Sequence, residues 1–409
     1  MPADTAKSAS FGEPGTSHRI GIDARKINDF GIGTYIRNLV SALGRLDHVN
    51  EYVLFVGKEG REELEDELAP NFTTAVESAP YYSMRELATL SWRLKRKRVD
   101  LYHATHYVLP ALLPCPAVVT IHDIIHLLYP EFLPGPLALA YAQRMIRSSL
   151  MRSRRVIADS RNTKTDLMGY FNVDGRRIRV IYPGVSEVFR QRLSADELDE
   201  RLGRLGIQRP YLLFVGNPKP HKNLDNVVKA LAKAIHESGV EGTLVCVGNR
   251  GSGEFKIRQR AAQLGIADRI RLMGHVEAEA LPAIYQGAVL FLYPTLYEGF
   301  GLPVVEAMAS GAPVITSNTS ALNEVADGYA HLVSPMDVDE IAGAIEHCLR
   351  DEEYRKKLSL LGRKRAEDFR WDVAAQQTLE VYASALRSDA ALRARRRKGL
   401  LGRWRRVGP

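Results

Sequence analysis

The stretch VLFLYPTLYEGFGLPVVEAMASGAPVIT (289–316) combines a run of apolar residues, a turn with two glycines, a helix of small residues and a second apolar run. Its first six residues are almost continuously apolar, as in a strand of a parallel sheet that is covered on both faces. Pro303 suits the start of the helix, because it has no amide hydrogen to leave unpaired there. Gly299 and Gly301 permit backbone conformations that other residues resist. The stretch therefore predicts a strand–loop–helix–strand unit.

The same pattern recurs along the chain of 409 residues. In the second half, apolar runs stand at 211–215, 244–247, 270–273, 289–294, 313–316 and 330–333. In the first half, the candidate strands are HRIGID, EYVLFV, FTTAV, VDLYH, AVVTIHD, RRVIAD and IRVIY, with helices predicted at 33–45, 83–97, 137–152 and 161–169. Strands that alternate with helices indicate parallel sheets. We expect an α/β protein of two doubly wound, Rossmann-like domains that face each other across a cleft.

Composition places the domain boundaries. The segment 1–18 has no apolar core, so we expect a disordered leader and not a signal peptide. A hinge is predicted to begin at Pro183. The expected order is an N-terminal domain at 19–185, a C-terminal domain at 186–370, a helix at 371–388 that packs back on the first domain, and a basic tail at 389–409. Open α/β sheets bind ligands beyond the carboxyl ends of their strands, so function should be sought in those loops.

The net charge of +8 comes from the end of the chain, where 391–409 has eight Lys and Arg residues and no acid. A nucleic-acid enzyme more often spreads basic residues over its folded surface, so we expect no nucleic-acid partner. The tail also contains Leu400, Leu401 and Trp404. That mixture fits an anionic membrane surface, and a solvated disordered end is the alternative.

Three cysteines without CxxC spacing indicate a reducing compartment, with the thiols packed as small apolar groups. The chain lacks a run of about 18 apolar residues, the length that a membrane span needs. We therefore expect a cytoplasmic protein that is peripherally associated with a membrane.

Two carboxylates flank the turn of the opening stretch, Glu298 and Glu306. The amides of Phe300, Gly301 and Leu302 would face outward at the positive end of the helix dipole, where a phosphate binds readily. Glu306 is expected in the first turn of this helix. A carboxylate accepts two hydroxyl protons from a vicinal diol. The loop thus fits a ribose diol, a diphosphate and a sugar diol in series, although a capped helix with surface acids is the alternative.

EGFGLPVVE, followed by AMASGAPVIT, resembles the E-x₇-E signature of the retaining family-4 glycosyltransferases, which have the GT-B fold. The resemblance covers about 19–388, and it implies that 19–185 is the acceptor-side domain and that 186–370 binds the nucleotide-sugar. It implies that Glu306 holds the ribose and that Glu298 lies at the transferred sugar. It also implies transfer of a hexose from a nucleotide-sugar to a glycan or lipid-linked acceptor, in the synthesis of envelope polysaccharide or glycolipid. The sequence is similar to mannosyltransferase members, so GDP-mannose is the expected donor.

VGNPKPHKNL follows the first strand of the second domain, and the family usually has two basic residues here. Lys222 matches the second. Gly216 and Asn217 are expected to contact the donor, but Asn217 stands where many members have arginine, and Lys219 or His221 are alternatives for that role. A cation about 4 Å from the leaving diphosphate is worth about 4 kcal/mol at an effective dielectric near 20, and it could replace a metal. The alternative for Lys222 is a solvated surface lysine.

Loops of the first domain supply further candidates. Gly31 and Gly33 precede a predicted helix and would form a second anion cradle for the diphosphate, with a plain loop as the alternative. His122 follows a buried strand, and the resemblance implies a place close to the transferred sugar. A histidine of the core or of a turn is the alternative there. The residues expected after another strand, lining the acceptor side, are His103, His106 and Tyr107.

Asp337 and Asp339 form a DVD sequence similar to the DxD metal motif of another glycosyltransferase fold. They begin an amphipathic helix, however, where aspartates cap the backbone and favour the dipole. His and Cys residues also lack metal-ligand spacing. We expect no metal and no cofactor apart from the nucleotide-sugar substrate.

Two basic stretches, 92–98 and 141–155, lie in the first domain. They are either solvated helix faces or surfaces for anionic lipid headgroups, to which each basic residue adds about 1 kcal/mol. Two other functions remain open from the sequence. One is a sugar-nucleotide epimerase of the GT-B fold, and the other is a noncatalytic adaptor that uses the basic tail on a membrane or nucleic acid.

Overall fold

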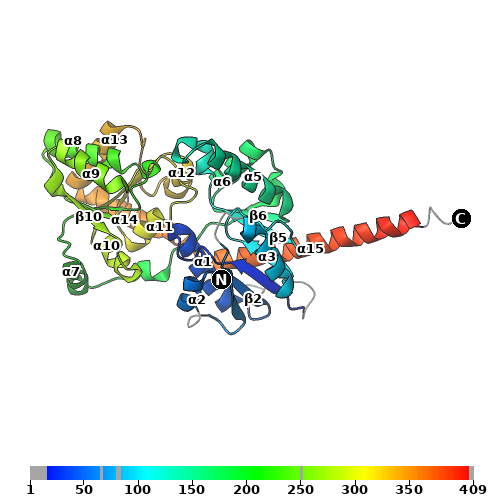
Figure 1. Cartoon of the computed structure of the whole chain (residues 1–409). Helices are drawn as coiled ribbons and strands as arrows, with labels where there is room; N and C mark the ends of the chain where they lie inside the picture. Colours follow the sequence, from blue (N-terminus) through cyan, green and yellow to red (C-terminus); the bar gives the residue numbers. More distant parts are fainter. Residues whose placement is uncertain (1–15, 65–67, 80–83, 249–251, 405–409) are drawn as a thin grey trace, which may run out of the picture. The chain divides into compact units, whose positions relative to one another are not determined.

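The computed structural model describes residues 16–64, 68–79, 84–248 and 252–404 (Figure 1). The chain divides into two compact units. Unit 1 comprises the described parts of Met1–Asp159, Thr163–Tyr182 and Trp371–Pro409, and unit 2 comprises those of Ser160–Asn162 and Pro183–Arg370. The segment predicted as a leader lies outside the described residues up to residue 15.

Unit 1 is built on a seven-stranded parallel sheet in the order β3-β2-β1-β4-β5-β6-β7. Its strands are β1 (Arg19–Asp23), β2 (Glu51–Val56), β3 (Phe72–Val76), β4 (Leu101–Ala104), β5 (Ala117–Ile121), β6 (Arg155–Ala158) and β7 (Ile178–Val180). The helices are α1 (Phe30–Leu46), α2 (Lys58–Leu64), α3 (Met84–Arg96), α4 (Ile125–Leu128), α5 (Pro136–Arg152), α6 (Arg161–Phe171) and α15 (Trp371–Trp404).

Alternate residues of these strands enter two separate hydrophobic clusters, because successive side chains of a strand point to opposite faces. Tyr52 and Leu54 pack in the cluster that holds buried residues of α1 and α15, whereas Val53 and Phe55 pack in the other. Both faces of the sheet are therefore covered, as the near-continuous apolar strands predicted.

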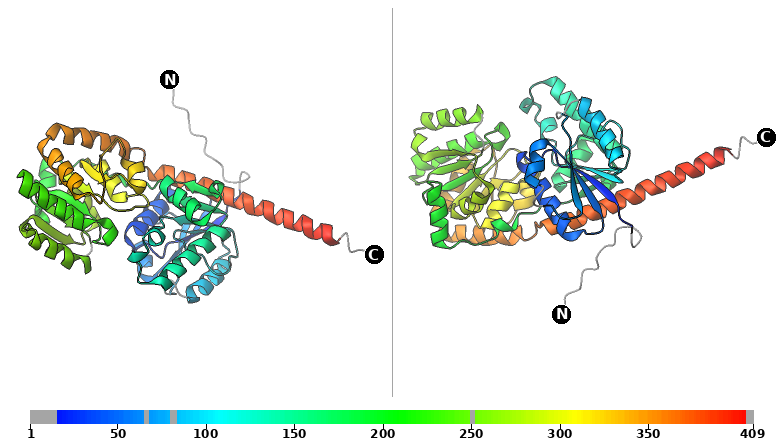
Figure 2. Two further views of the ribbon diagram at one scale, coloured as in Figure 1. Left: turned by 90° about the horizontal axis from the view of Figure 1, so that it is seen from above. Right: turned by 60° about the horizontal axis from the view of Figure 1, so that its bottom comes forward.

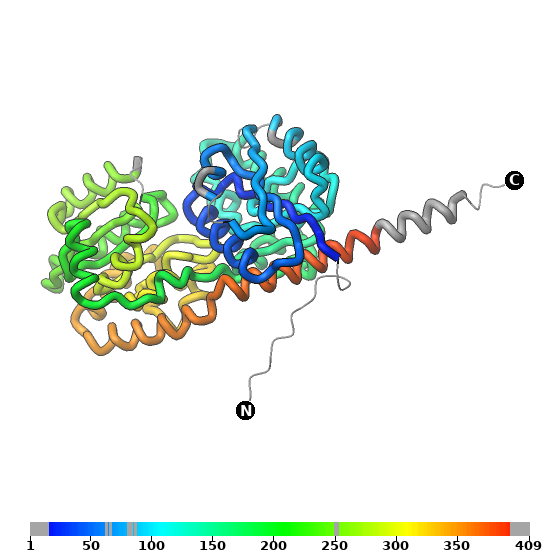
Figure 3. Tube along the Cα trace, turned by 90° about the horizontal axis from the view of Figure 1, so that it is seen from below, coloured from blue at the N-terminus to red at the C-terminus, as the bar shows by residue number. Residues whose placement is uncertain are grey.

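The last helix, α15, belongs to unit 1 and packs against α1, and Figure 3 shows its orange-red start beside the blue N-terminal segment. Its buried residues recur every three or four positions, at Trp371, Ala374, Ala375, Leu379 and Tyr382. That spacing places them on one face of the helix. The helix was predicted for 371–388 but continues to Trp404, and its side chains are described as far as Leu392.

Unit 2 is built on a six-stranded parallel sheet in the order β10-β9-β8-β11-β12-β13, shown from further directions in Figure 2. Its strands are β8 (Leu212–Val215), β9 (Leu244–Val247), β10 (Ile270–Gly274), β11 (Leu290–Tyr293), β12 (Val314–Ser317) and β13 (His331–Val333). The helices are α7 (Ala195–Arg204), α8 (Leu224–Ser238), α9 (Ser252–Gln263), α10 (Leu281–Gly287), α11 (Leu302–Ser310), α12 (Ser320–Ala326), α13 (Val338–Arg350) and α14 (Glu352–Ala366).

Both sheets have the doubly wound strand order, so the prediction of two Rossmann-like α/β domains is confirmed. In each sheet the chain runs outward to one edge and then returns to build the other half. The strand order reverses between β1 and β4 in unit 1 and between β8 and β11 in unit 2. Loops at the carboxyl ends of these strand pairs are the places where such sheets bind ligands.

The three cysteines, Cys115, Cys246 and Cys348, are buried and form no disulfide, which confirms that they pack as apolar groups. No helix in the described part of the chain combines the length and the apolar character that crossing a membrane requires.

Candidate functional site

The loops that follow β8 and β11 are held together at the switch point of the unit 2 sheet. After β8 the chain forms a 3₁₀ turn, Pro220–Lys222, and enters α8 through Asn223, which has a φ of 61°. The side-chain amide of Asn223 donates to the carbonyl of Pro294 at 2.8 Å. The amide of Leu296 donates to the carbonyl of His221 at 2.8 Å. These bonds join the two loops and bring their polar side chains into contact.

Lys222 and Glu298 form an ion pair across this junction. The ammonium Nζ lies 2.6 Å from Glu298 Oε1 and 2.8 Å from the hydroxyl of Tyr293. Tyr293 in turn donates to Glu298 Oε1 at 3.1 Å. The side chains of Lys222 and Glu298 are 19% and 13% exposed. The structure thus brings together the lysine and the first glutamate that the sequence singled out, and Lys222 is not a solvated surface residue.

The surroundings keep Lys222 charged. Burial by itself lowers the pKa of the ammonium, but Glu298 and Tyr293 outweigh it and hold this pKa above its ordinary value. An ammonium has three N–H donors. Two of them point to Glu298 and Tyr293, which leaves the third for an anionic ligand.

Glu306 is the fifth residue of α11, so the expectation of an acid in the first turn is wrong. The helix begins at Leu302 and has no acid in its first turn, since Gly301 serves as its N-cap. The hydroxyl of Tyr285 donates to Glu306 Oε2 at 2.9 Å. Burial raises the pKa of Glu306 to about 7, against the lowering effect of this hydrogen bond. The carboxyl group therefore titrates close to neutral pH.

The start of α11 depends on glycine. Gly301 has a φ of 101°, a left-handed conformation that disfavours side chains, and a Cβ there would lie 2.4 Å from Leu322 Cδ2. Phe300 is buried and packs edge-on against Phe369 with ring centroids 5.3 Å apart. Its ring therefore belongs to the core of unit 2, and the donor contact expected of the backbone amides of Phe300, Gly301 and Leu302 stays a prediction.

The turn between β8 and Lys222 contains the other residues that were predicted to contact the donor. Gly216 has a φ of 153°, and Asn217 is half-buried in the turn after β8. Lys219 is exposed, and its amide donates to the carbonyl of Asn217 at 2.7 Å. His221 is half-buried. The residue that replaces the usual first basic group therefore stays open among these candidates.

In unit 1, His122 directly follows β5 and both of its ring nitrogens have partners. Nδ1 lies 2.6 Å from Asp159 Oδ2, and Nε2 lies 2.9 Å from the carbonyl oxygen of Thr105. A carboxylate and a carbonyl both accept hydrogen bonds, so both ring nitrogens carry protons in this arrangement. Burial lowers the pKa of His122, but the charge and hydrogen bond of Asp159 outweigh burial and raise it. Asp159 thus favours the protonated ring of His122 at the end of its strand.

His103 is not on the acceptor side, and this prediction is wrong. It is the third residue of β4, fully buried, and hydrogen bonded to Tyr382 at 2.7 Å and to Thr120 at 2.8 Å. Burial, helped by the charge of His122, lowers the pKa of His103 to about 3. His106 and Tyr107 do follow the strand, with their rings 3.9 Å apart, and both are half-buried.

Gly31 and Gly33 lie inside α1, which begins at Phe30, and not before it as predicted. The amide of Gly33 donates to the carbonyl of Asp29 at 2.5 Å. A Cβ on Gly33 would lie 2.1 Å from the carbonyl oxygen of Ile27, whereas a Cβ on Gly31 would meet no atom within 4 Å. Packing against the preceding loop therefore accounts for Gly33.

Sequence reasoning missed several polar residues around these groups. Tyr293 lies within a strand of apolar residues, and Tyr285 lies in a helix that was not predicted. Asp23, at the end of β1, pairs with Arg25 at 2.6 Å and accepts from Tyr102 at 2.9 Å. The sequence DARK (23–26), with three charged residues at the end of the first strand, is a usable signal for that pair. The partner of His122, Asp159, is too distant in sequence to be found by spacing.

The aspartates of the DVD sequence cap α13, as predicted. Asp337 accepts from the amides of Asp339 and Glu340, each at 3.0 Å. Asp339 also pairs with Lys233 at 2.7 Å. Within the described ranges, groups of three or more His, Cys, Asp or Glu residues suited to a metal do not occur. The independence from metal ions remains a prediction.

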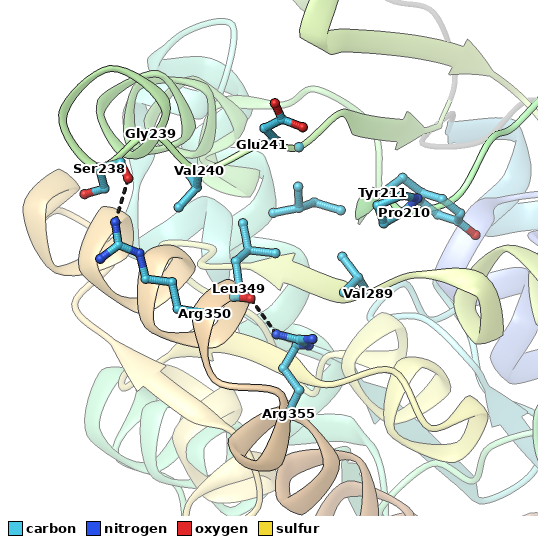
Figure 4. Close-up of a pocket in the computed structure, with 12 residues that line it drawn as sticks. Pro210, Tyr211, Ser238, Gly239, Val240, Glu241, Val289, Leu349, Arg350 and Arg355 are labelled. Atoms are coloured by element: carbon cyan, nitrogen blue, oxygen red, sulfur yellow. Dashed lines mark hydrogen bonds between the residues drawn. The ribbon is translucent and has the colours of Figure 1, made fainter.

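A cavity of about 360 Å³ lies at the amino ends of the unit 2 strands, opposite the switch-point loops (Figure 4). It is lined by Leu212, the first residue of β8. Its two arginines are engaged by helix ends. Arg350 donates to the carbonyl of Ser238 at 2.6 Å, and Arg355 donates to the carbonyls of Cys348 and Leu349 at 2.6 and 2.7 Å. The last carbonyls of a helix need such partners. The arginines are therefore structural, and the polar cluster with Lys222 is the stronger candidate site.

Two family models match most of the chain. The model described as Glycosyltransferase Family 4 matches residues 31–188, and that described as Glycosyl transferases group 1 matches residues 200–365. O-antigen chain mannosyltransferase B of Escherichia coli is 28% identical over 365 residues, which are 86% of this chain and 95% of that protein. MMP alpha-(1->4)-mannosyltransferase of Mycolicibacterium hassiacum is 33% identical over 231 residues, which are 56% of this chain and 53% of that protein.

Solved structures share the fold. Anabaena Alr3699/HepE in complex with UDP and glucose has a TM-score of 0.73 and 20% identity, over 90% of this chain and 100% of that chain. WaaG, a glycosyltransferase involved in lipopolysaccharide biosynthesis, has a TM-score of 0.72 and 15% identity, over 88% of this chain and 99% of that chain. At these identities the likeness concerns the fold alone.

Proposed function

Because this chain belongs to the family-4 glycosyltransferases of the GT-B fold, we propose that it transfers a hexose from a nucleotide-sugar to a glycan or lipid-linked acceptor with retention of the anomeric configuration. The observation that carries this proposal is the contact of Lys222 with Glu298 at the switch point of unit 2. One half of this pair suits a diphosphate and the other a sugar hydroxyl. A noncatalytic adaptor would need neither group.

Each residue has a task in the transfer. As the glycosidic bond breaks, negative charge grows on the leaving phosphate, and the remaining N–H of Lys222 together with the amides at the start of α11 stabilise it. Glu298 accepts hydroxyl protons of the transferred sugar, and Glu306 accepts those of the ribose. The place of His122 beside the transferred sugar stays a prediction, since both of its ring nitrogens already have protein partners. The leaving phosphate takes the proton of the acceptor hydroxyl on the same face of the sugar, so a protein nucleophile is not required.

We propose mannose as the sugar and GDP-mannose as the donor. The support is that one relative over a long alignment and one over a shorter alignment are mannosyltransferases. The structural neighbour HepE binds UDP, which supports a nucleotide-sugar donor but a different base. Polysaccharide or glycolipid synthesis is proposed from the O-antigen relative and from WaaG. We also propose that the reaction needs no divalent cation, since Lys222 supplies positive charge at the phosphate.

A membrane-bound acceptor is supported by one face of α5. Leu137 and Met151 are 87% and 65% exposed, and Arg144 and Arg147 are exposed between them. Positions spaced by three or four residues share a face of a helix, so these side chains form one stripe with apolar ends and a basic middle. Such a stripe suits an anionic lipid surface, with about 1 kcal/mol from each basic residue. The protein is proposed to be peripheral to the cytoplasmic leaflet.

The test of the function is transfer of radiolabelled mannose from GDP-mannose to a lipid extract, with UDP-glucose as the alternative donor. NMR of the product gives the anomeric configuration. We expect a labelled lipid product with an α-linked sugar. An epimerised donor without any acceptor product would support the epimerase instead, and a β-linked product would contradict retention.

The test of the membrane surface uses Arg144→Glu/Arg147→Glu and deletion of 391–409 in flotation with phosphatidylglycerol vesicles. Both variants should bind the vesicles less while transferring sugar to a detergent-solubilised acceptor at the wild-type rate. Unchanged flotation of both variants would refute the lipid surface, and a wild-type protein that binds the vesicles but transfers no sugar would favour the adaptor.

A further inference from the structure

The two glutamates of the signature each accept a hydrogen bond from a buried tyrosine. Tyr293 on β11 donates to Glu298 at 3.1 Å, and Tyr285 on α10 donates to Glu306 at 2.9 Å. Both tyrosines are 0% exposed. Each glutamate of the signature is therefore held by a hydroxyl that comes from the buried core.

The two rings belong to one packed aromatic group. Phe291, also 0% exposed, lies 5.4 Å from the Tyr285 ring in an edge-on contact and 5.6 Å from the Tyr293 ring in a stacked contact. Phe189 and Phe214 extend the group at its ends, with ring centroids 5.7 Å and 5.8 Å from Tyr285 and Tyr293. Side chains in such dense packing hold a single rotamer. The positions of both hydroxyls are thus fixed by the core and not by the ligand.

The hydroxyl of Tyr293 has a second partner, because it accepts from Lys222 Nζ at 2.8 Å. Without a donor substrate, Glu298 is satisfied by both the ammonium and the phenol. When a diphosphate attracts the ammonium, the carboxylate loses part of its pairing, and a poorly paired buried charge is costly. The phenol remains in place to compensate.

We propose that Tyr293 and Tyr285 are positioning residues for glycosyl transfer. Tyr293 keeps the side chains of Glu298 and Lys222 in position while the diphosphate binds and leaves. Tyr285 orients Glu306 toward the ribose. This inference rests on the proposed function. The two residues act at different stages. Tyr293 serves groups at the reacting bond, so it governs kcat, whereas Tyr285 serves a group at the nucleotide, so it governs the KM for the donor.

The variants Tyr293→Phe and Tyr285→Phe remove only the hydroxyl and keep the aromatic packing. The matched control is Tyr211→Phe. Tyr211 is also 0% exposed in unit 2, and its hydroxyl donates to the backbone carbonyl of Ile284 at 2.6 Å, without contacting a glutamate. Tyr285→Phe and Tyr211→Phe each lose one buried hydrogen bond, and Tyr293→Phe loses two, so the thermal stability of each variant is measured beside its kinetics.

Kinetics with GDP-mannose and a lipid extract should separate the three variants. Losing a hydrogen bond to a charged group changes a rate or binding constant by about 10- to 100-fold. Tyr293→Phe should lower kcat by about that factor at unchanged KM. Tyr285→Phe should raise the KM for the donor by a similar factor at unchanged kcat, and Tyr211→Phe should change neither.

A second readout is the pH dependence of donor binding, measured by calorimetry with GDP-mannose. The hydrogen bond of Tyr285 lowers the pKa of Glu306. Donor binding should strengthen as pH rises and Glu306 ionises, because the carboxylate accepts the ribose hydroxyls. The pH at the midpoint of this change should therefore be higher in Tyr285→Phe and unchanged in Tyr293→Phe and Tyr211→Phe. The proposal is overturned if the tyrosines of the site give the same kinetics and the same pH midpoint as Tyr211→Phe. Failure of the proposed function would appear differently, as a wild-type protein that neither binds nor uses the donor.

Discussion

Replacing Lys222 with methionine removes the ammonium while keeping a side chain of similar length. In the native site Lys222 Nζ lies 2.6 Å from Glu298, and both side chains are less than one-fifth exposed. The variant leaves Glu298 with the phenol of Tyr293 as its hydrogen-bond partner at this oxygen. Two separate quantities should therefore change, the stability of unit 2 and the rate of transfer.

The loss of stability follows from the unpaired carboxylate. Removing one partner of a buried ion pair costs about 3–5 kcal/mol, and the slight exposure of this pair places the expected value near 3 kcal/mol. For a domain of this size that lowers Tm by roughly 6–12 °C. The double variant Lys222→Met/Glu298→Gln removes both charges, so it should recover most of this loss.

The loss of activity has a different cause. A cation about 4 Å from the leaving phosphate is worth about 4 kcal/mol at an effective dielectric near 20. That corresponds to a rate factor of roughly a thousand. Transfer of labelled mannose at saturating donor should therefore fall by about this factor in the single variant, and it should not recover in the double variant.

The comparison of the two variants separates folding from chemistry, with calorimetry for stability and single-turnover transfer for rate. Both are measured at a temperature where the proteins are folded. A Lys222→Met protein that is folded and transfers sugar within tenfold of the wild-type rate would refute the role assigned to the ammonium. Recovery of the rate together with stability in the double variant would show that Lys222 only maintains the fold.

Other consequences concern pH and packing. Burial raises the pKa of Glu306 from 4.5 to about 7, so its stabilising contribution is complete below pH 4.5 and lost as pH rises through 7. Glu306→Gln should be more stable than the wild type at pH 8, by up to about 3 kcal/mol. In the wild type, donor binding should strengthen between pH 6 and 8 as Glu306 ionises and accepts the ribose hydroxyls, and Glu306→Gln should abolish this pH dependence. The pKa of His122 in the folded protein is raised above 6.5, so the stability that the protonated ring confers is complete below pH 6.5 and is lost as pH rises through the pKa of the folded state. Asp159→Asn should lower the pKa of His122, measured by an NMR titration of the ring. Gly33→Ala should destabilise unit 1 by about 1–3 kcal/mol in thermal unfolding, whereas Gly31→Ala, with open space around it, should be neutral or slightly stabilising.

The sequence predicted the architecture because each strand is short and apolar and is followed by a polar loop and a helical period. The strand 211–215 appears as β8, and the strand 289–294 appears as β11. The loops after these two strands supply Lys222 and Glu298, so the position of the paired groups followed from the pattern. Their adjacency did not, because it depends on the order in which strands join the sheet.

The errors have physical causes of their own. His103 was expected to line the acceptor side, but a neutral imidazole with two hydrogen-bond partners can lie in the core, and β4 includes it. Gly31 and Gly33 were expected in a glycine-rich loop before a helix, yet the packing of Gly33 against Ile27 requires glycine inside the first turn of α1. Helix ends are set by such tertiary contacts.

The supporting residues could not be found by spacing. Tyr285 and Tyr293 are buried aromatic residues in elements that look like ordinary core, and only the structure shows that their hydroxyls reach the two glutamates. Asp159 lies 37 positions from His122 in the sequence and meets it at 2.6 Å because β5 and β6 are neighbours in the sheet.

The central claim is that unit 2 binds a sugar diphosphate through the Lys222 ammonium and the start of α11, without a divalent cation. Its most direct test is thermal unfolding of the purified protein with GDP-mannose, UDP-glucose and ADP-glucose in turn, each in the presence of EDTA. A ligand that binds the folded state at 100 times its Kd raises stability by about 2.7 kcal/mol. We predict such a rise for one of these donors, undiminished by EDTA and absent in Lys222→Met. A rise that requires a divalent ion, or no rise with any activated sugar, would contradict the claim.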